Sequence, residues 1–319
     1  MAESGAPSPS PSPEVRIVEV GPRDGLQNEP APIPTEVKVR FVRGLAAAGL
    51  REIEVTSFVH PKAVPQLADA AEVLEALDAP AARAAEAAGG PCYSALVPNP
   101  RGLERAIASG IGRIAVFTAA SDAFTQANIR MSVAESLEVF GPVVAEARAA
   151  GLDVRGYVST AFTCPYAGEV SEDRVREVVA ALAAMGCREI AVSDTIGAAA
   201  PRDIRRVLGA VADAVPMDRI ALHLHDTYGT ALTNVQAGWE AGVRCFDASA
   251  GGLGGCPYAP GAAGNLATED LVYFLERQGI ATGIDLEAVF RAASLVSEVL
   301  GRPLPGKNWQ RLAAACRSA

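Results

Sequence analysis

The sequence predicts an α/β fold in which a parallel sheet closes into a (β/α)8 TIM barrel, followed by a C-terminal helical extension. Eight short apolar runs, rich in β-branched residues, alternate with helix-like segments over about 265 residues. Ionisable residues recur where these runs end. No GxGxxG follows the first run, so the alternative of a doubly wound open sheet has less support.

The elements follow one another as strand and helix. Short runs rich in Val and Ile predict strands, and apolar residues spaced three or four apart predict helices. The predicted strands are 15–20, 52–56, 93–97, 113–118, 153–159, 189–193, 220–225 and 243–249. The predicted helices are 35–48, 66–77, 101–109, 132–150, 172–185, 202–214, 230–241 and 268–277, and the appended helix is 286–300. An Ala-rich stretch up to Gly90 has no clear pattern.

Three regions divide the chain. Residues 1–14, MAESGAPSPSPSPE, predict a disordered tail rich in Pro and Ser. Residues 15–283 predict the barrel domain, and residues 284–319 a C-terminal helix and tail. The first region has neither an apolar core nor an Arg-rich amphipathic pattern, so we expect a cytoplasmic protein.

Composition excludes several classes of function. The formal net charge of -9 argues against a nucleic-acid partner, and the uninterrupted apolar runs are too short for a membrane span. Six cysteines without CxxC spacing predict free thiols, most of them buried, in a reducing compartment. We therefore expect a small-molecule ligand rather than a nucleic acid or a membrane.

The segment LHLHD carries the strongest chemical signal. His223 and His225 lie two residues apart on a predicted strand, so their imidazoles share one face. In isolation this pattern more often marks core histidines. In a barrel, however, active-site residues gather at the carboxyl ends of the strands, where Asp24 and Asn265 are also expected. This set of nitrogen and oxygen donors suits Mg²⁺ or Mn²⁺, although zinc and cobalt remain possible.

Other candidate residues follow the same rule of position. Arg23 lies beside Asp24 in GPRDGLQNE, Glu54 lies in the second strand, and Asp194 ends the sixth. Glu54 and Asp194 are equally compatible with a structural role. Cys256 belongs to the Gly-rich segment 251–265, which is expected to form a lid whose thiol faces the site.

At these positions the chain resembles the 3-hydroxy-3-methylglutaryl-CoA lyase family of DRE-type metal-dependent barrel lyases. The resemblance covers roughly residues 15–283. Its motifs are VEVGPRDGLQNE, TSFVHPKAVPQ, RGYVSTAFTCPY, SDTIG, HLHDTYG and GGLGGCPYAPGAAGNLATEDLVYFLE. The last of these distinguishes the lyases from related condensing enzymes.

The resemblance implies cleavage of 3-hydroxy-3-methylglutaryl-CoA to acetyl-CoA and acetoacetate. It implies a divalent metal on Asp24, His223, His225 and Asn265, with Arg23 and Gln27 as substrate contacts. Arg23, Cys256, Asp194 and Glu54 would form the catalytic group, in a homo-oligomer that is a dimer or tetramer. The general acid and the general base stay open. Three alternatives also stay open: the same chemistry on a longer 3-hydroxy-3-alkylglutaryl-CoA, the condensing direction, and a non-catalytic barrel that binds acyl-CoA.

The chain departs from the family pattern at a few positions. Pro30 stands where a Lys is common, His60 and Ser193 replace a small residue and a Gly, and Ala63 stands where an aromatic is common. These residues lie beside the expected site. We therefore expect them to influence acyl-chain preference or affinity for CoA.

Overall fold

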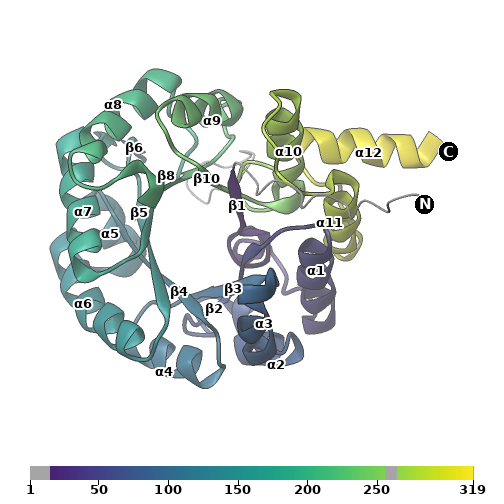
Figure 1. Ribbon diagram of the computed structural model, residues 1–319, viewed down its shortest axis with the longest axis horizontal. Helices are drawn as coiled ribbons and strands as arrows, with labels where there is room; N and C mark the ends of the chain where they lie inside the picture. The colour runs from purple at the N-terminus through teal and green to yellow at the C-terminus, as the bar shows by residue number, and fades with distance from the viewer. Residues whose placement is uncertain (1–14, 256–263, 319) are drawn as a thin grey trace, which may run out of the picture.

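The predicted barrel is confirmed by the computed structural model of the chain, which describes residues 15–255 and 264–318. Eight parallel strands close into a barrel in the order β1-β10-β9-β8-β5-β4-β3-β2, with the helices on its outside (Figure 1). The strands are β1 (Arg16–Glu19), β2 (Glu52–Ser57), β3 (Cys92–Leu96), β4 (Arg113–Ala119), β5 (Asp153–Ser159), β8 (Glu189–Asp194), β9 (Ile220–Leu224) and β10 (Cys245–Ala248). A small hairpin, β6 (Thr163–Cys164) and β7 (Gly168–Glu169), follows β5.

Most helices lie where the apolar spacing places them. They are α1 (Thr35–Ala47), α2 (Ala70–Ala76), α3 (Ala79–Ala85), α4 (Pro100–Ala108), α5 (Asp122–Ile129), α6 (Val133–Ala149), α7 (Glu172–Met185), α8 (Pro201–Ala212), α9 (Ala231–Glu240), α10 (Thr268–Arg277), α11 (Leu286–Leu300) and α12 (Lys307–Ser318). The appended helix α11 packs against α1 and so covers the outer face of the first βα unit (Figure 1).

Three helices were not expected from the sequence. The Ala-rich stretch contains α3, whose first turn is capped by Asp78, the acceptor of the Ala81 N–H at 3.3 Å. Alanine favours a helix without giving it an apolar period, so the pattern there is weak. Helix α5 lies in the loop after β4, and α12 forms most of the expected C-terminal tail.

Contacts of Asp270 and Trp309 explain why the tail is helical. Asp270 accepts hydrogen bonds from the backbone N–H groups of Lys307 and Asn308 at 2.9 and 2.7 Å, which satisfies two free donors at the start of α12. Trp309 is buried against the main core. Tertiary contacts therefore fix a helix whose own sequence signal is modest.

Apolar side chains form two separate layers. The larger one fills the space between the barrel and its helices, with Phe41, Phe162 and Phe246 among its largest fully buried members. The smaller one lies inside the barrel and consists of Val18, Val20, Leu96, Ala115, Tyr157, Ala191, Ala221 and Cys245. Three of these residues are alanines, so this inner apolar layer is small. Polar groups occupy the barrel interior on both sides of it.

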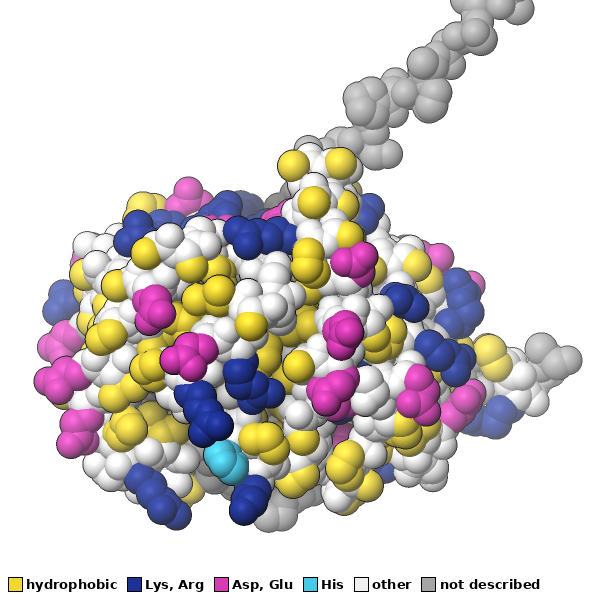
Figure 2. Space-filling view, turned by 90° about the horizontal axis from the view of Figure 1, so that it is seen from below, with side chains coloured by type: hydrophobic (Ala, Val, Ile, Leu, Met, Phe, Trp, Pro, Cys, Tyr) yellow, Lys and Arg dark blue, Asp and Glu magenta, His cyan; other side chains and the backbone are white. Residues whose placement is uncertain are grey.

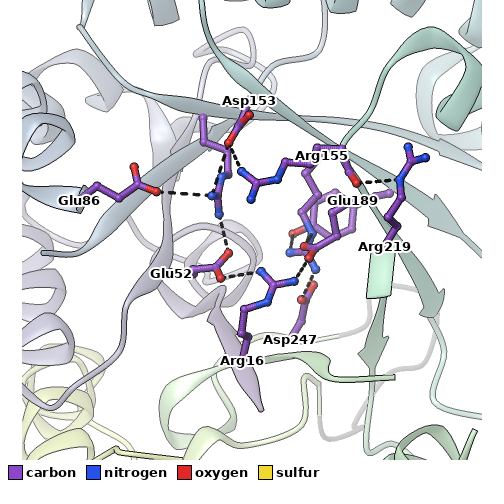
Figure 3. Close-up of polar contacts among 11 residues, drawn as sticks. Arg16, Glu52, Glu86, Asp153, Arg155, Glu189, Arg219 and Asp247 are labelled. Atoms are coloured by element: carbon purple, nitrogen blue, oxygen red, sulfur yellow. Dashed lines mark hydrogen bonds and ion pairs between the residues drawn. The ribbon is translucent and has the colours of Figure 1, made fainter. Parts of the chain in front are cut away.

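The amino-terminal ends of the strands carry a network of ion pairs (Figure 3). Arg155, on β5, pairs with Asp247 at 2.6 Å and with Glu189 at 3.0 Å, and Arg16 pairs with Glu52 at 2.7 Å and also with Glu189. This end of a TIM barrel supports the fold rather than the chemistry. We refer to Arg16, Glu52, Arg155 and Glu189 as the basal ion-pair network, from which Arg155 reaches Asp247 beside His223.

The surface contains charges of both signs. On the face drawn in Figure 2, basic and acidic side chains are interspersed. Among the described residues, no helix is long and apolar enough to span a bilayer. The four predicted core cysteines, Cys92, Cys164, Cys187 and Cys245, are buried free thiols.

Candidate active site

Asp24, His223 and His225 form a compact cluster at the carboxyl ends of the strands. Each offers one ligand atom, and these atoms all lie within 4.8 Å of one another. The two Nε2 atoms of the imidazoles are 3.2 Å apart, and both rings are buried. One carboxylate and two imidazoles at this spacing fit a divalent cation.

A tight turn after β1 brings Asp24 to the histidines. The carbonyl of Val20 accepts the N–H groups of Arg23, Asp24 and Gly25 at 3.1, 2.7 and 3.2 Å, so the chain coils directly at the strand end. A Cβ at Gly25 would lie 2.9 Å from the Cβ of Leu253, which only glycine avoids. The segment GPRDG therefore forms the turn through its glycines and also supplies Asp24 to the site.

The local charges favour the forms that bind a cation. Burial opposes ionisation of Asp24, but Arg23 and the two imidazoles outweigh it, so the pKa of this carboxyl lies below its usual range. Burial and the neighbouring His223 lower the pKa of His225 to about 4. An ionised carboxylate and a neutral imidazole are the states that a metal ligand requires.

Asn265 lies against this cluster. Its side-chain Nδ2 donates to Asp24 Oδ2 at 2.8 Å and to the carbonyl of Leu253 at 3.2 Å, and its backbone bridges to His225. Asn265 therefore lies next to the carboxylate of Asp24, with its amide nitrogen on that carboxylate, whereas a fourth ligand to a cation would use the amide oxygen. Cys256 lies outside the described residues.

A second buried group connects Arg23 with Glu54 and Tyr157. Arg23 Nε donates to Glu54 Oε1, and the hydroxyl of Tyr157 donates to Glu54 Oε2 at 3.2 Å. The guanidinium of Arg23 lies 5.6 Å from the centre of the Tyr157 ring and also pairs with Asp24. Glu54 thus holds the arginine beside the cluster of Asp24, His223 and His225, and the arginine carries its charge into a buried site.

Asp194 does not belong to the cluster of Asp24, His223 and His225. Its carboxylate accepts the N–H groups of Ala198 and Ala199, each at 3.0 Å, and burial raises its pKa to about 6. This geometry supports the loop after β8. Of the two roles left open for Asp194, the contacts favour the structural one.

These groups surround a cavity of about 440 Å³. Arg23, Asp24, Gln27, His223 and His225 all line it. Apolar side chains form part of its wall: Leu96, Pro98, Phe117, Phe124 and Ile129. Hydroxyl side chains form another part, from Ser159 on β5, Ser193 on β8 and Thr195 just after β8. His60 and Ala63 also line the cavity, as expected for residues beside the site.

Several residues of the site escaped the sequence analysis. Asp247 Oδ2 lies 3.1 Å from His223 Nδ1 and accepts a hydrogen bond from it, and Arg155 links Asp247 to the hydroxyl of Tyr157. The available signal was strand alternation, because Arg155 and Tyr157 lie two apart in β5 and therefore share its inner face. Asp247, a charged residue within the apolar run CFDA, gave the same kind of signal.

Glu19 and Glu269 were also missed, and both support the loops around the cavity. Glu19 accepts the N–H groups of Gly21 and Ala250 at 2.8 and 2.9 Å, and the hydroxyl of Thr268 at 2.6 Å. Glu269 accepts the N–H of Gly251 at 2.7 Å. Burial raises the pKa of Glu19 to about 7 and that of Glu269 to about 8.

The fold and the site define a TIM-barrel protein with a candidate metal centre at the catalytic end of its strands. A family model described as HMGL-like matches residues 14–296. A mitochondrial hydroxymethylglutaryl-CoA lyase of Bos taurus is 48% identical over 304 residues, which cover 95% of this chain and 90% of that protein. The chain belongs to the HMGL-like family.

Solved structures agree with this assignment. The crystal structure of a hydroxymethylglutaryl-CoA lyase from Pseudomonas aeruginosa matches with a TM-score of 0.88 and 47% identity, over 94% of this chain and 98% of that one. An HMG-CoA lyase from Acinetobacter baumannii, solved with coenzyme A and 3-methylmalate, matches with a TM-score of 0.85 and 38% identity, covering 92% and 93%.

Proposed function

We propose that this protein is a metal-dependent carbon–carbon lyase that cleaves 3-hydroxy-3-methylglutaryl-CoA to acetyl-CoA and acetoacetate. The observation that carries the proposal is the meeting of Asp24, His223 and His225 beside the buried Arg23 in one cavity. Relatives with this named activity align with almost the whole chain, and one of them was solved with coenzyme A. A small acyl-CoA is therefore the substrate.

Asp24, His223, His225 and Asn265 would hold the cation, with Mg²⁺ or Mn²⁺ as the ion. When bound, it would supply a Lewis acid that polarises an oxygen of the acyl group. The donor set supports this assignment, because it combines hard oxygen ligands with neutral imidazoles and, among the described residues, includes no thiolate.

Arg23 would provide the second positive charge. Cleavage leaves an enolate on the acetyl-CoA fragment, and a guanidinium fixed by Glu54 and Asp24 can stabilise that oxygen without having to reorganise. Gln27 lines the same cavity and would contact the substrate. Arg23 would act directly on the reacting atoms, and Glu54 would position it.

Proton transfer completes the reaction. One group must take the proton of the C3 hydroxyl, and another must protonate the enolate carbon. Cys256 and Asp24 remain the candidates among the side chains, and the thiol remains a prediction. Since burial raises the pKa of Tyr157 well above its usual value, its phenol keeps its proton and can serve as a hydrogen-bond donor to Glu54.

The alternatives have less support. A barrel that only binds acyl-CoA has no need of a buried arginine held against two carboxylates at the metal cluster. The proposal also includes a homo-oligomer, as a dimer or tetramer, and a location in the cytoplasm. Light scattering of the purified protein tests the first, and cell fractionation the second.

The decisive experiment measures acetoacetate release from 3-hydroxy-3-methylglutaryl-CoA. The purified protein is assayed after EDTA treatment and again after addition of Mg²⁺ or Mn²⁺, next to His223→Ala. We expect release that depends on the metal and is lost in the variant. Failure of the metal-loaded wild type to release acetoacetate would refute the proposal.

A further inference from the structure

Ser193 carries a buried hydroxyl group that the site described so far does not use. It lies on β8, two residues after Ala191, which belongs to the inner layer of the barrel, so both side chains share the inward face. In the strand register Ser193 pairs with His223. The residue is 4% exposed, and its Oγ has no hydrogen-bond partner among residues 15–255 and 264–318.

A buried hydroxyl without a partner is unfavourable, and such groups in native proteins call for an explanation. Ser193 lines the cavity that contains the metal cluster, so a bound ligand can supply the missing acceptor. This argument depends on the function proposed above. The 3-hydroxy-3-methylglutaryl group offers three kinds of oxygen: the thioester carbonyl, the C3 hydroxyl and the distal carboxylate.

The strand order indicates which of these oxygens Ser193 meets. Arg23 follows β1, and β10 and β9 separate β1 from β8, so Ser193 and Arg23 lie on different sides of His223, on β9. If Arg23 contacts the thioester end of the substrate and the cation lies between Arg23 and Ser193, the distal end of the acyl group faces β8. Ser159 and Thr195 line the same side of the cavity.

We infer that Ser193 donates a hydrogen bond to the distal carboxylate of the substrate. An ionised carboxylate accepts several hydrogen bonds and makes stronger ones than a neutral oxygen does. Ser193 is thereby a specificity residue, which favours acyl-CoA molecules with a second carboxylate over those with a plain alkyl end.

Two acyl-CoA ligands test this contact without turnover. Glutaryl-CoA and butyryl-CoA both lack the C3 hydroxyl, so neither can be cleaved in this reaction, and only glutaryl-CoA has the distal carboxylate. Their affinities are measured by calorimetry on the Mg²⁺-loaded wild type, Ser193→Ala and Ser193→Gly. We expect both variants to bind glutaryl-CoA about 10- to 100-fold more weakly and to bind butyryl-CoA within twofold of the wild type.

Ser109→Ala serves as the matched control, since Ser109 Oγ donates to the Ala106 carbonyl at the end of α4 and does not line the cavity. Its affinities for both ligands should stay unchanged. The midpoint of thermal unfolding and the affinity for Mn²⁺ show whether each variant keeps its fold and metal site. If Ser193→Ala unfolds, Ser193→Gly, which restores the residue that the family pattern has at this position, carries the test.

Equal weakening of glutaryl-CoA and butyryl-CoA would overturn the inference, and so would unchanged affinity for glutaryl-CoA. Either result can coexist with normal acetoacetate release by the wild type, in which case only the contact of Ser193 is refuted. Absence of acetoacetate release refutes the proposed function instead, and the two failures are thus distinguished.

Discussion

His223 Nδ1 lies 3.1 Å from Asp247 Oδ2, and the other carboxylate oxygen of Asp247 accepts from Arg155 at 2.6 Å. Asp247 is buried, and Arg155 and His223 outweigh the cost of burial, so the pKa of its carboxyl lies below its usual range. An ionised Asp247 can only accept, so Nδ1 carries the proton and Nε2 is free to bind a cation.

Replacement of this carboxylate should weaken the metal site. We expect Asp247→Asn to bind Mn²⁺ about 10- to 100-fold more weakly, because the amide no longer fixes the tautomer and orientation of His223. Titration of the metal-free protein with Mn²⁺ measures the effect. Asp213→Asn, at an exposed carboxylate after α8, is the control. Equal affinities of Asp247→Asn and the wild type would contradict this role.

Arg23→Gln should separate chemistry from metal binding. Loss of the guanidinium removes the charge that would stabilise the enolate, so we expect kcat to fall about 100- to 1000-fold. The ligand atoms of Asp24, His223 and His225 remain, and Mn²⁺ affinity should change by less than about tenfold, the factor typical of lost support to a ligand. A parallel loss of metal would show that Arg23 acts through Asp24.

Tyr157→Phe should lower the stability of the fold. The hydroxyl of Tyr157 accepts from Arg155 Nη1 at 3.0 Å and donates to Glu54 Oε2 at 3.2 Å, and both partners are buried. Its removal should lower the free energy of unfolding by about 1 to 3 kcal/mol. Urea unfolding measures this change. Unfolding at the wild-type midpoint would mean that water replaces the hydroxyl.

Glu19 makes stability depend on pH. The pKa of Glu19 is about 7 in the folded protein and about 4.5 in the unfolded chain, so unfolding releases its proton between these values. The free energy of unfolding should therefore fall as pH rises from about 5 to 8. Glu269, with a pKa of about 8, should continue this fall to higher pH. We expect Glu19→Gln to flatten this dependence, because the amide can accept from Gly21 and Ala250 and donate to Thr268.

Unfolding free energies at pH 5.5 and pH 8 test this expectation, with Glu177→Gln as an exposed control. The control should keep the slope of the wild type. A Glu19→Gln variant with the same slope would place the titrating group elsewhere.

The barrel was predictable because its strands and helices repeat a simple pattern. Each strand needs only a short run of Val, Ile or Ala, and eight such runs alternating with helices have few compact arrangements. The residues of the candidate metal cluster were predictable for the same reason: Asp24 lies in the turn after β1 and His223 near the end of β9, and the fold brings the strand ends together.

What sequence could not give was the pairing of groups across the barrel. Asp247 and Arg155 are 92 residues apart, and nothing local indicates that they meet. Glu19 and Thr268 are separated by 249 residues. The short helix α5 was missed because its eight residues are too few to show a clear apolar period, although Ser121 precedes it as an N-cap. Such contacts depend on closure of the sheet and emerge only in three dimensions.

The basal ion-pair network has a consequence for heat tolerance. The free-energy cost of removing charged groups from water falls as temperature rises, whereas the stabilisation from burying apolar surface levels off. The amino-terminal end of the barrel is closed by ion pairs among Arg16, Arg155 and Glu189. We therefore expect this end to lose less stability on warming than the rest of the barrel. We expect the strand openings around the cavity to loosen first, so that heated samples lose activity before they lose the barrel.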